Sequence, residues 1–160
     1  MITSHLRRNN ATIVNPQIKS LNYLNNILAS IEARRYGADE AILLNSEGLV
    51  TECTGDNIFI VKRGVICTPP IWLGTLDGIT RMVVLEIAQK MGYTVKEVPF
   101  TLFDVLNADE AFLTGTAAEI IALTELDGQP IADGVAGEIT LALLQEFRKY
   151  TKLEESGAKI

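Results

Sequence analysis

The sequence predicts one α/β domain in which helices flank a mixed β-sheet. Segments with apolar residues at helical spacing are interspersed with short apolar runs that are bounded by turn residues. Several of these short runs are joined by tight turns, and hairpins of this kind require antiparallel pairing, so the sheet is mixed rather than purely parallel. The chain has 160 residues, of which 48% are hydrophobic, and this is enough for one buried core.

The N-terminal part predicts short strands and then a helix. Ile2-Thr3-Ser4 and Thr12-Ile13-Val14 are the strand candidates, and Pro16 ends this part of the chain. Leu21–Arg35 follows, with apolar residues at helical spacing and a glycine just beyond its end. We therefore expect the first helix to begin at Leu21.

The middle of the chain predicts two hairpins. Their strands are Ala41–Leu44, a strand that begins at Leu49-Val50, Ile58–Val61 and Val65–Cys67. Residues 45–48 form the first turn and Arg63-Gly64 the second. Ile71–Leu76 is expected as a loop that is anchored by the packing of Trp72.

The second half predicts three helices and three strands. The helices are Ile79–Met91, Thr101–Leu106 and Glu138–Tyr150, and the strands are Thr94–Val98, Glu110–Thr114 and Ile120–Leu123. The expected buried positions are Met82, Leu85, Ile87 and Ala88 in the second helix and Ile139, Leu143, Leu144 and Phe147 in the last one. Residues 151–160 are polar, so we expect a domain over residues 1–150 and a frayed tail after it.

Composition excludes several classes of function. The net charge is −6 and Lys and Arg are not clustered, which argues against nucleic acid and anionic membranes as partners. Two cysteines, Cys53 and Cys67, do not make a disulfide framework, so a reduced, cytoplasmic setting is expected. His5 is the only histidine, so we expect no metal site. No apolar run is long enough for a membrane helix, and the first residues lack a signal-peptide pattern.

Two features point to a ligand with a basic nitrogen at one end and a phosphate at the other. Glu52 ends an apolar run at a turn rich in Gly and Asp, and Gly78-Ile79-Thr80 opens a helix whose N–H groups attract an anion. Lys19 lies just before the first predicted helix, where a positive helix end and apolar neighbours would lower its pKa. A lysine that attacks an aldehyde needs such a shift, although a solvated loop lysine is the simpler explanation of this residue alone.

The stretch from Glu52 to Arg81 resembles the signature of the class IV aminotransferases, which are pyridoxal-phosphate enzymes of fold type IV. The matching positions are Glu52, Thr54, Asn57-Ile58-Phe59, Ile66, Thr68, Leu76, Gly78, Ile79 and Arg81. In addition, Lys19–Leu24 is similar to the cofactor-lysine segment of branched-chain aminotransferases, and Thr114–Glu119 to their late active-site turn. The resemblance covers about residues 1–150 and corresponds to the larger, C-terminal domain of that family.

This resemblance implies a fold and a set of residue roles. The mixed sheet would form a partly closed barrel with flanking helices. Lys19 would be catalytic, because it would hold pyridoxal 5'-phosphate covalently and move a proton between the substrate α-carbon and the cofactor. Cofactor binding would involve Tyr23 (ring oxygen), Glu52 (pyridine nitrogen), Leu76 (ring face) and Ile79, Thr80 and Thr116 (phosphate). Substrate binding would involve Gly55, Thr116 and Ala117.

The resemblance also implies an activity and partners. The substrates would be small molecules, with an amino group moving between Leu, Ile or Val and 2-oxoglutarate, and the complete protein would be a homo-oligomer. Tyr23 and the Gly115-Thr116-Ala117 turn favour the branched-chain type over D-amino-acid aminotransferases and aminodeoxychorismate lyases. The family's small N-terminal domain is not in this sequence, so this chain alone is expected to bind cofactor weakly. A non-catalytic module that binds a partner subunit is the alternative from a different functional class.

Overall fold

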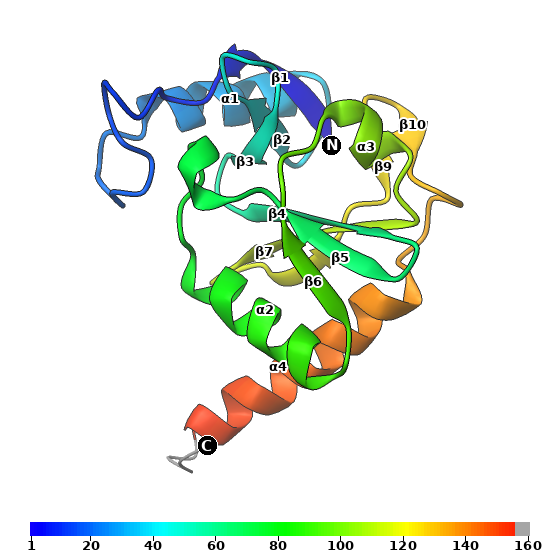
Figure 1. Cartoon of the computed structure of the whole chain (residues 1–160). Helices are drawn as coiled ribbons and strands as arrows, with labels where there is room; N and C mark the ends of the chain where they lie inside the picture. The colour runs from blue at the N-terminus through cyan, green and yellow to red at the C-terminus, as the bar shows by residue number, and fades with distance from the viewer. Residues whose placement is uncertain (156–160) are drawn as a thin grey trace.

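The computed structural model describes residues 1–155 and contains the interspersed helices and strands that the sequence predicts (Figure 1). The strands are β1 (Ile2–Arg7), β2 (Ala41–Leu44), β3 (Val50–Cys53), β4 (Asn57–Lys62), β5 (Val65–Thr68), β6 (Thr94–Glu97), β7 (Glu110–Gly115), β8 (Glu119–Ala122), β9 (Glu125–Leu126) and β10 (Gln129–Pro130). The helices are α1 (Leu24–Arg35), α2 (Ile79–Lys90), α3 (Leu102–Leu106) and α4 (Glu138–Glu155), with a 3₁₀ turn, η1, at Ile71–Leu73.

The strands form three sheets, and two of these sheets are mixed. Their orders are β1-β2-β3, β6-β5-β4-β7-β8 and β10-β9. The β1–β2 and β5–β6 pairs are parallel, whereas the β2–β3, β4–β5, β4–β7 and β7–β8 pairs are antiparallel. The expectation of a mixed α/β fold is therefore confirmed. Within residues 1–155 the strands pair as separate sheets rather than as one closed ring.

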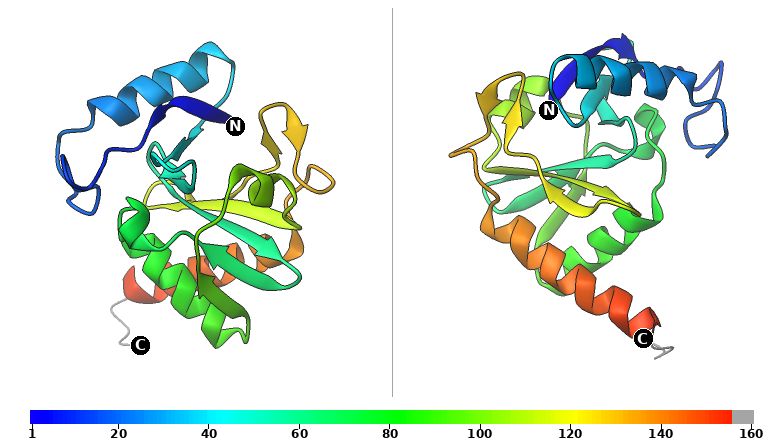
Figure 2. Two further views of the ribbon diagram at one scale, coloured as in Figure 1. Left: turned by 45° about the horizontal axis from the view of Figure 1, so that its top comes forward. Right: turned by 180° about the vertical axis from the view of Figure 1, so that it is seen from behind.

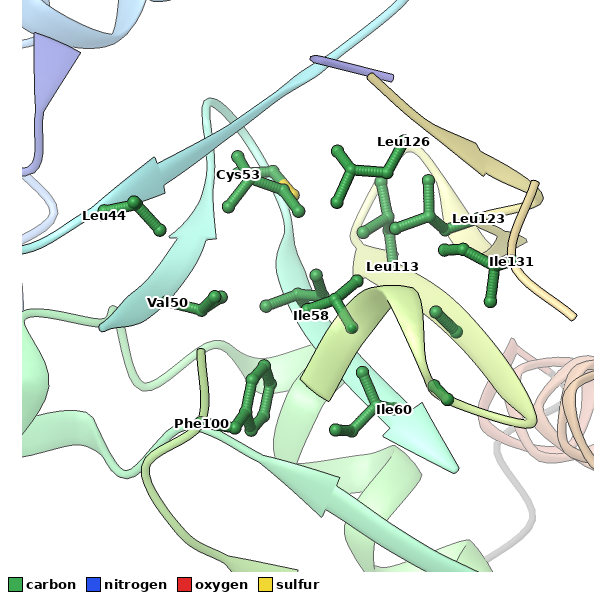
Figure 3. Close-up of a cluster of buried hydrophobic side chains, with 14 residues drawn as sticks. Leu44, Val50, Cys53, Ile58, Ile60, Phe100, Leu113, Leu123, Leu126 and Ile131 are labelled. Carbon is green, nitrogen blue, oxygen red and sulfur yellow. The ribbon is translucent and has the colours of Figure 1, made fainter. Parts of the chain in front are cut away.

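The molecule is layered, with a hydrophobic cluster on each side of the five-stranded sheet. The α1 helix lies along the outer side of β1 and β2, while α2 and α4 lie against β7 and β8 at the opposite end of the molecule (Figures 1 and 2). Successive residues of β4 point to opposite faces. Ile58 and Ile60 therefore enter the cluster between the two larger sheets (Figure 3), and Phe59 and Val61 enter the cluster under α2 and α4. No helix of the described chain is long and apolar enough to cross a membrane.

The predicted strand at Thr12–Val14 is wrong, because Asn10 folds this segment into turns. The Asn10 Oδ1 atom accepts hydrogen bonds from the Thr12 amide (2.9 Å) and hydroxyl (2.8 Å). The backbone carbonyl of Asn10 accepts hydrogen bonds from the Ile13 and Val14 amides at 3.0 and 3.2 Å. A short polar side chain of this kind competes with strand pairing for the backbone donors. The strand before it is longer than predicted and continues to Arg7.

Two predicted helix boundaries differ from the structure, namely the start of α1 and the end of α4. The α1 helix begins at Leu24 instead of Leu21, because the Ser20 hydroxyl accepts from the Asn22 amide at 3.3 Å and forms a local turn. Lys19 is therefore separated from the helix by several residues and does not sit in its first turn. The α4 helix continues past Tyr150 to Glu155. The rest of the predicted tail, residues 156–160, lies outside the described residues.

Two expected packing positions are wrong. Trp72 is 66% exposed, and the neighbouring Leu73 is buried in its place. On α2 the buried face contains Val84, Ile87 and Ala88, which recur at the three- and four-residue spacing of one helix face. Met82 lies off that face and is 46% exposed. On α4 the prediction is confirmed for Leu143 and Phe147, which are buried, and for Ile139 and Leu144, which pack against them.

The cluster under α2 and α4 is centred on two stacked phenylalanines, and we expect it to dominate stability. Phe59 and Phe112 face each other across the β4–β7 pair, with ring centroids 4.9 Å apart and planes at 5°. Phe59→Ala should lower the free energy of unfolding by about 3–5 kcal/mol, as measured by urea denaturation. Phe103→Ala, at an exposed phenylalanine of α3, is the control and should cost roughly 0.5 kcal/mol or less. Equal losses in the two variants would contradict this view of the core.

Candidate active site

Glu52 lies at the end of β3 with its carboxylate buried in a network of donors. The residue is 5% exposed. Its Oε2 atom accepts hydrogen bonds from Asn57 Nδ2 at 3.0 Å and from the Leu76 amide at 2.9 Å. The turn after β3 makes this possible, since the Cys53 amide donates to the Asp56 carbonyl at 2.8 Å and returns the chain beside Glu52. The carboxylate is thus held by the start of β4 and by the segment that precedes α2.

The other oxygen of this carboxylate is paired with Arg8, just after β1. The Arg8 guanidinium forms a salt bridge with Glu52 Oε1, and both side chains are 7% exposed. Arg8 also donates to Asn26 Oδ1 on α1 at 2.7 Å and to the Gly74 carbonyl at 3.2 Å. All three guanidinium nitrogens therefore have an acceptor. The rigid fork of arginine suits such a junction, because its donors are fixed relative to one another.

Burial and these partners have opposite effects on the pKa of Glu52. Burial disfavours the charged form and raises the pKa of Glu52 to about 7. Arg8, the Leu76 hydrogen bond and the Lys19 charge each act to lower the pKa of Glu52 and so limit that rise. The net effect is a pKa of Glu52 well above the ordinary value of a glutamate carboxyl.

Lys19 and Tyr23 come to the same hollow from the loop between Pro16 and α1. This hollow, which we call the Glu52 hollow, is lined by Lys19, Tyr23, Glu52, Gly55 and Leu76 among the residues predicted from the sequence. Lys19 is exposed. The Tyr23 hydroxyl donates to the Thr54 carbonyl. Burial raises the pKa of Tyr23, and the Glu52 charge acts in the same direction, so the phenol remains a donor at neutral pH.

The N-terminus of α2 is joined to Glu52 through Asn57. The amide of Asn57 that donates to Glu52 also donates to the Leu76 carbonyl at 2.9 Å, and its Oδ1 atom lies where a Cβ on Gly78 would sit. Only glycine permits this contact. No side chain among residues 1–155 caps this helix end. By contrast, the N-terminus of α4 is capped by Glu110. The first N–H groups of α2 thus have no side-chain acceptor among residues 1–155, and groups of this kind favour an anion.

The turn between β7 and β8 is brought to the same region by strand pairing. Asn57 pairs with Thr114 at the end of β7, so the following turn lies beside the turn that enters β4. Asp56 packs directly on Gly115, where any Cβ would overlap its Oδ1 atom. Burial raises the pKa of Asp56, and Glu40 adds to the rise. Thr116 and Ala117, at the tip of this turn, are exposed.

The predicted site residues therefore fall into two groups. Lys19, Tyr23, Glu52, Gly55 and Leu76 line the Glu52 hollow. Ile79, Thr80, Thr116 and Ala117 lie outside its lining, with Ile79 74% exposed and Thr80 7% exposed. In the described part of the chain no group of three or more His, Cys, Asp or Glu side chains could hold a metal ion.

Arg8 and Asn26 are site residues that the sequence did not reveal. Arg8 is one of two adjacent arginines, and this pair is too short to signal a function. Both of its side-chain partners, Asn26 and Glu52, are remote in sequence. Only the buried cation next to a buried carboxylate identifies Arg8, and that observation needs the fold.

The raised pKa of Glu52 predicts a pH dependence of stability. The carboxyl titrates at 4.5 when solvated and at about 7 in the folded chain, so the folded state binds the proton more tightly. Stability from this group is therefore present below pH 4.5 and lost as the pH rises through 7. Relative to Glu52→Gln, the free energy of unfolding of the unmodified chain should fall by about 3 kcal/mol between about pH 4 and about pH 8. Urea denaturation of both proteins measures this difference, and a difference that is constant with pH would contradict the assignment.

Comparison with known proteins identifies the family. The family model described as "Amino-transferase class IV" matches residues 1–126. A protein of Methanocaldococcus jannaschii, provisionally assigned as a branched-chain-amino-acid aminotransferase, is 52% identical over 92% of this chain and 51% of its own length. The D-alanine aminotransferase of Listeria monocytogenes (strain 10403S) is 48% identical over 81% of this chain and 45% of its own. The chain thus spans about half the length of these relatives.

A solved structure gives the same result in three dimensions. The branched-chain amino acid aminotransferase of Thermobaculum terrenum, in its pyridoxal-phosphate form, superimposes with a TM-score of 0.90 at 40% identity. The match covers 93% of this chain and 49% of that protein. The fold, the matched segment and the identity to these relatives agree, and the chain belongs to the class IV aminotransferases.

Proposed function

We propose that this chain is the cofactor-binding part of a pyridoxal-phosphate-dependent branched-chain aminotransferase, with residues 1–150 as its domain. The observation that carries the proposal is the Asn57 bridge, which joins a buried carboxylate to the uncapped N-terminus of α2. A carboxylate suits a protonated ring nitrogen, and open helix N–H groups suit a phosphate. Lys19, on the same hollow, supplies the amine that this class of cofactor requires.

The donors and acceptors around the hollow fit pyridoxal phosphate. Glu52 would pair with the ring nitrogen, the Tyr23 hydroxyl would donate to the ring oxygen, and Leu76 would pack on the ring face. When bound, the cofactor supplies an electron sink for negative charge at the substrate α-carbon. Lys19 would hold the cofactor and carry the proton to and from that carbon. The Ile79 and Thr80 amides, the Thr80 hydroxyl and Thr116 would hold the phosphate.

Amino acids and 2-oxo acids are the proposed substrates. Exposed amides at Thr116 and Ala117 would bind the substrate α-carboxylate, and Gly55 would leave room for the side chain of Leu, Ile or Val. The M. jannaschii relative supports the branched-chain type over more of this chain than the Listeria relative supports the D-alanine type. D-alanine transamination is the second candidate, because that relative is still 48% identical.

The proposal also covers the shape of the β-sheets and the cellular setting of the protein. The three- and five-stranded sheets would form one partly closed barrel, and their arrangement supports this because β3 leads into β4 through a single tight turn at residues 54–56. A cytoplasmic setting is supported by two unpaired cysteines, of which Cys53 is buried.

Covalent trapping on Lys19 tests the proposed function. Chain mixed with pyridoxal phosphate and then reduced with borohydride should carry the cofactor on Lys19, as located by peptide mass spectrometry. Lys19→Ala should lose essentially all of this product. Lys96→Ala, at an exposed lysine of β6, is the matched control and should retain it. An equal yield in Lys19→Ala would refute the assignment.

The same preparation separates the two candidate substrates. Leucine and D-alanine are added separately to the cofactor-loaded chain, and the conversion of bound cofactor to its amine form is followed by absorbance. Faster conversion with leucine supports the branched-chain type. Faster conversion with D-alanine would contradict the branched-chain type and support D-alanine transamination instead.

We also propose that the complete protein is a homo-oligomer that associates through the outer face of α1. Leu24, Ile27, Leu28 and Ile31 recur at helical spacing on this face and are exposed, whereas the helix buries Asn26, Ala29 and Ala33. An apolar face of this kind favours association.

Charge placed on this face should therefore reduce the molecular mass in solution. Ile27→Glu combined with Ile31→Glu is expected to shift the protein from oligomer to monomer in light scattering coupled to size exclusion. Leu141→Glu, at an exposed leucine of α4, is the control and should leave the mass unchanged. A parent protein that is already monomeric, or a double variant with the parent's mass, would contradict this interface.

A further inference from the structure

Arg8 is a buried cation whose contacts all converge on the proposed cofactor site. It reaches Glu52, Asn26 on α1 and the Gly74 carbonyl, so it links three segments around the Glu52 hollow. The adjacent Arg7 is exposed and lies at the end of β1. Arg8 follows the last residue of β1, and it is the arginine of the pair whose side chain lines the hollow.

The acceptor capacity of Glu52 leaves room for one more donor. An ionised carboxylate has about four lone-pair positions. Within residues 1–155 three donors reach Glu52, namely Asn57 and Leu76 on Oε2 and Arg8 on Oε1. One position on Oε1 therefore remains for a donor that enters the hollow.

Among the charged groups around Glu52, Arg8 is the main one that favours the ionised form of the Glu52 carboxyl. Tyr23 and Asp56 line the same hollow, and neither side chain supplies a positive charge. Lys19 is the other nearby cation, but it is exposed and its effect on Glu52 is smaller than that of Arg8. Arg8 is thus the main opponent of the desolvation that favours the neutral acid.

We propose that Arg8 is a positioning residue for the cofactor: its buried guanidinium orients Glu52 and favours its ionised form, so that a proton shared with the pyridine nitrogen would reside on that nitrogen when the cofactor is bound. The inference rests on the proposed function. The two protonation states would differ only in the position of one proton, which would be bonded either to a carboxylate oxygen of Glu52 or to the ring nitrogen. Without Arg8 the buried acid keeps the proton, and the ring nitrogen becomes an uncharged acceptor.

The test is the protonation state of the ring nitrogen in variants of Arg8. Pyridoxal phosphate labelled with ¹⁵N at that position is bound to the chain, and its NMR signal distinguishes the pyridinium from the neutral pyridine. The unmodified chain should give the pyridinium signal. Arg8→Met should give the neutral signal and bind the cofactor about tenfold more weakly, because a charge-assisted hydrogen bond becomes a neutral one.

Two controls separate charge from structure. Arg7→Met, at the exposed neighbour, should match the unmodified chain in signal and affinity. Arg8→Lys keeps a cation and loses the fork, so it should retain the pyridinium signal while binding more weakly. If Arg8→Met does not fold, Arg8→Gln replaces it, since glutamine removes the charge but still offers a donor. The melting temperature of each variant is measured alongside.

The outcomes distinguish this inference from the proposed function. Failure of the unmodified chain to form the Lys19 adduct would refute the function. An adduct on Lys19 together with a pyridinium signal in a folded, uncharged Arg8 variant would overturn the role of Arg8 and leave the function standing. Weaker binding with unchanged ring protonation would likewise overturn it, because that result is expected of a purely structural residue.

Discussion

The burial of the Glu52 carboxylate is the constraint on which the candidate site depends. Taking this group out of water disfavours its charge, and the cost is offset only because Arg8, Asn57 and Leu76 all donate to it. These donors come from the end of β1, the start of β4 and the segment before α2. The carboxylate therefore also ties together parts of the chain that are far apart in sequence, and loss of one donor would leave a buried charge partly uncompensated.

The two consecutive residues at the entry to β4 extend this network to the proposed anion-binding segments. Asn57 contacts the backbone at Gly78, and Asp56 packs against Gly115. Because side chains alternate in direction along a strand, one dipeptide can touch the start of α2 and the turn after β7 at once. The glycines at these two positions allow the close approach. The relative placement of the proposed nitrogen-binding and phosphate-binding ends is thus determined by Asp56 and Asn57.

The sequence was most informative where function depends on local spacing. Lys19, Tyr23, Glu52, Gly55 and Leu76 are predicted from the positions of the family motifs, and the structure brings them to one hollow. Arg8 could not be found this way, because its meaning comes from partners on other elements.

The errors in the predicted fold have similar physical causes. The predicted strand at residues 12–14 is absent because the Asn10 side chain and backbone carbonyl accept the hydrogen bonds of its amides, and apolar periodicity does not register local hydrogen bonds of this kind. The apolar pattern of α1 correctly indicated a helix, but such a pattern does not say whether its apolar face meets the core or another molecule. Neither its start nor its exposure could be read from spacing alone.

The alternation of side chains along β4 has a consequence for how the domain unfolds. This strand sends Ile58 and Ile60 into one hydrophobic cluster and Phe59 and Val61 into the other, so neither cluster can separate from the sheet without disturbing the other. We therefore expect the two clusters to unfold as a single cooperative unit, with the β4 amides exchanging their hydrogens with solvent only when the whole domain opens. The loop that carries Lys19 lies outside this unit. Most residues of this loop are exposed, so we expect that it can rearrange around a ligand at little cost to the stability of the scaffold.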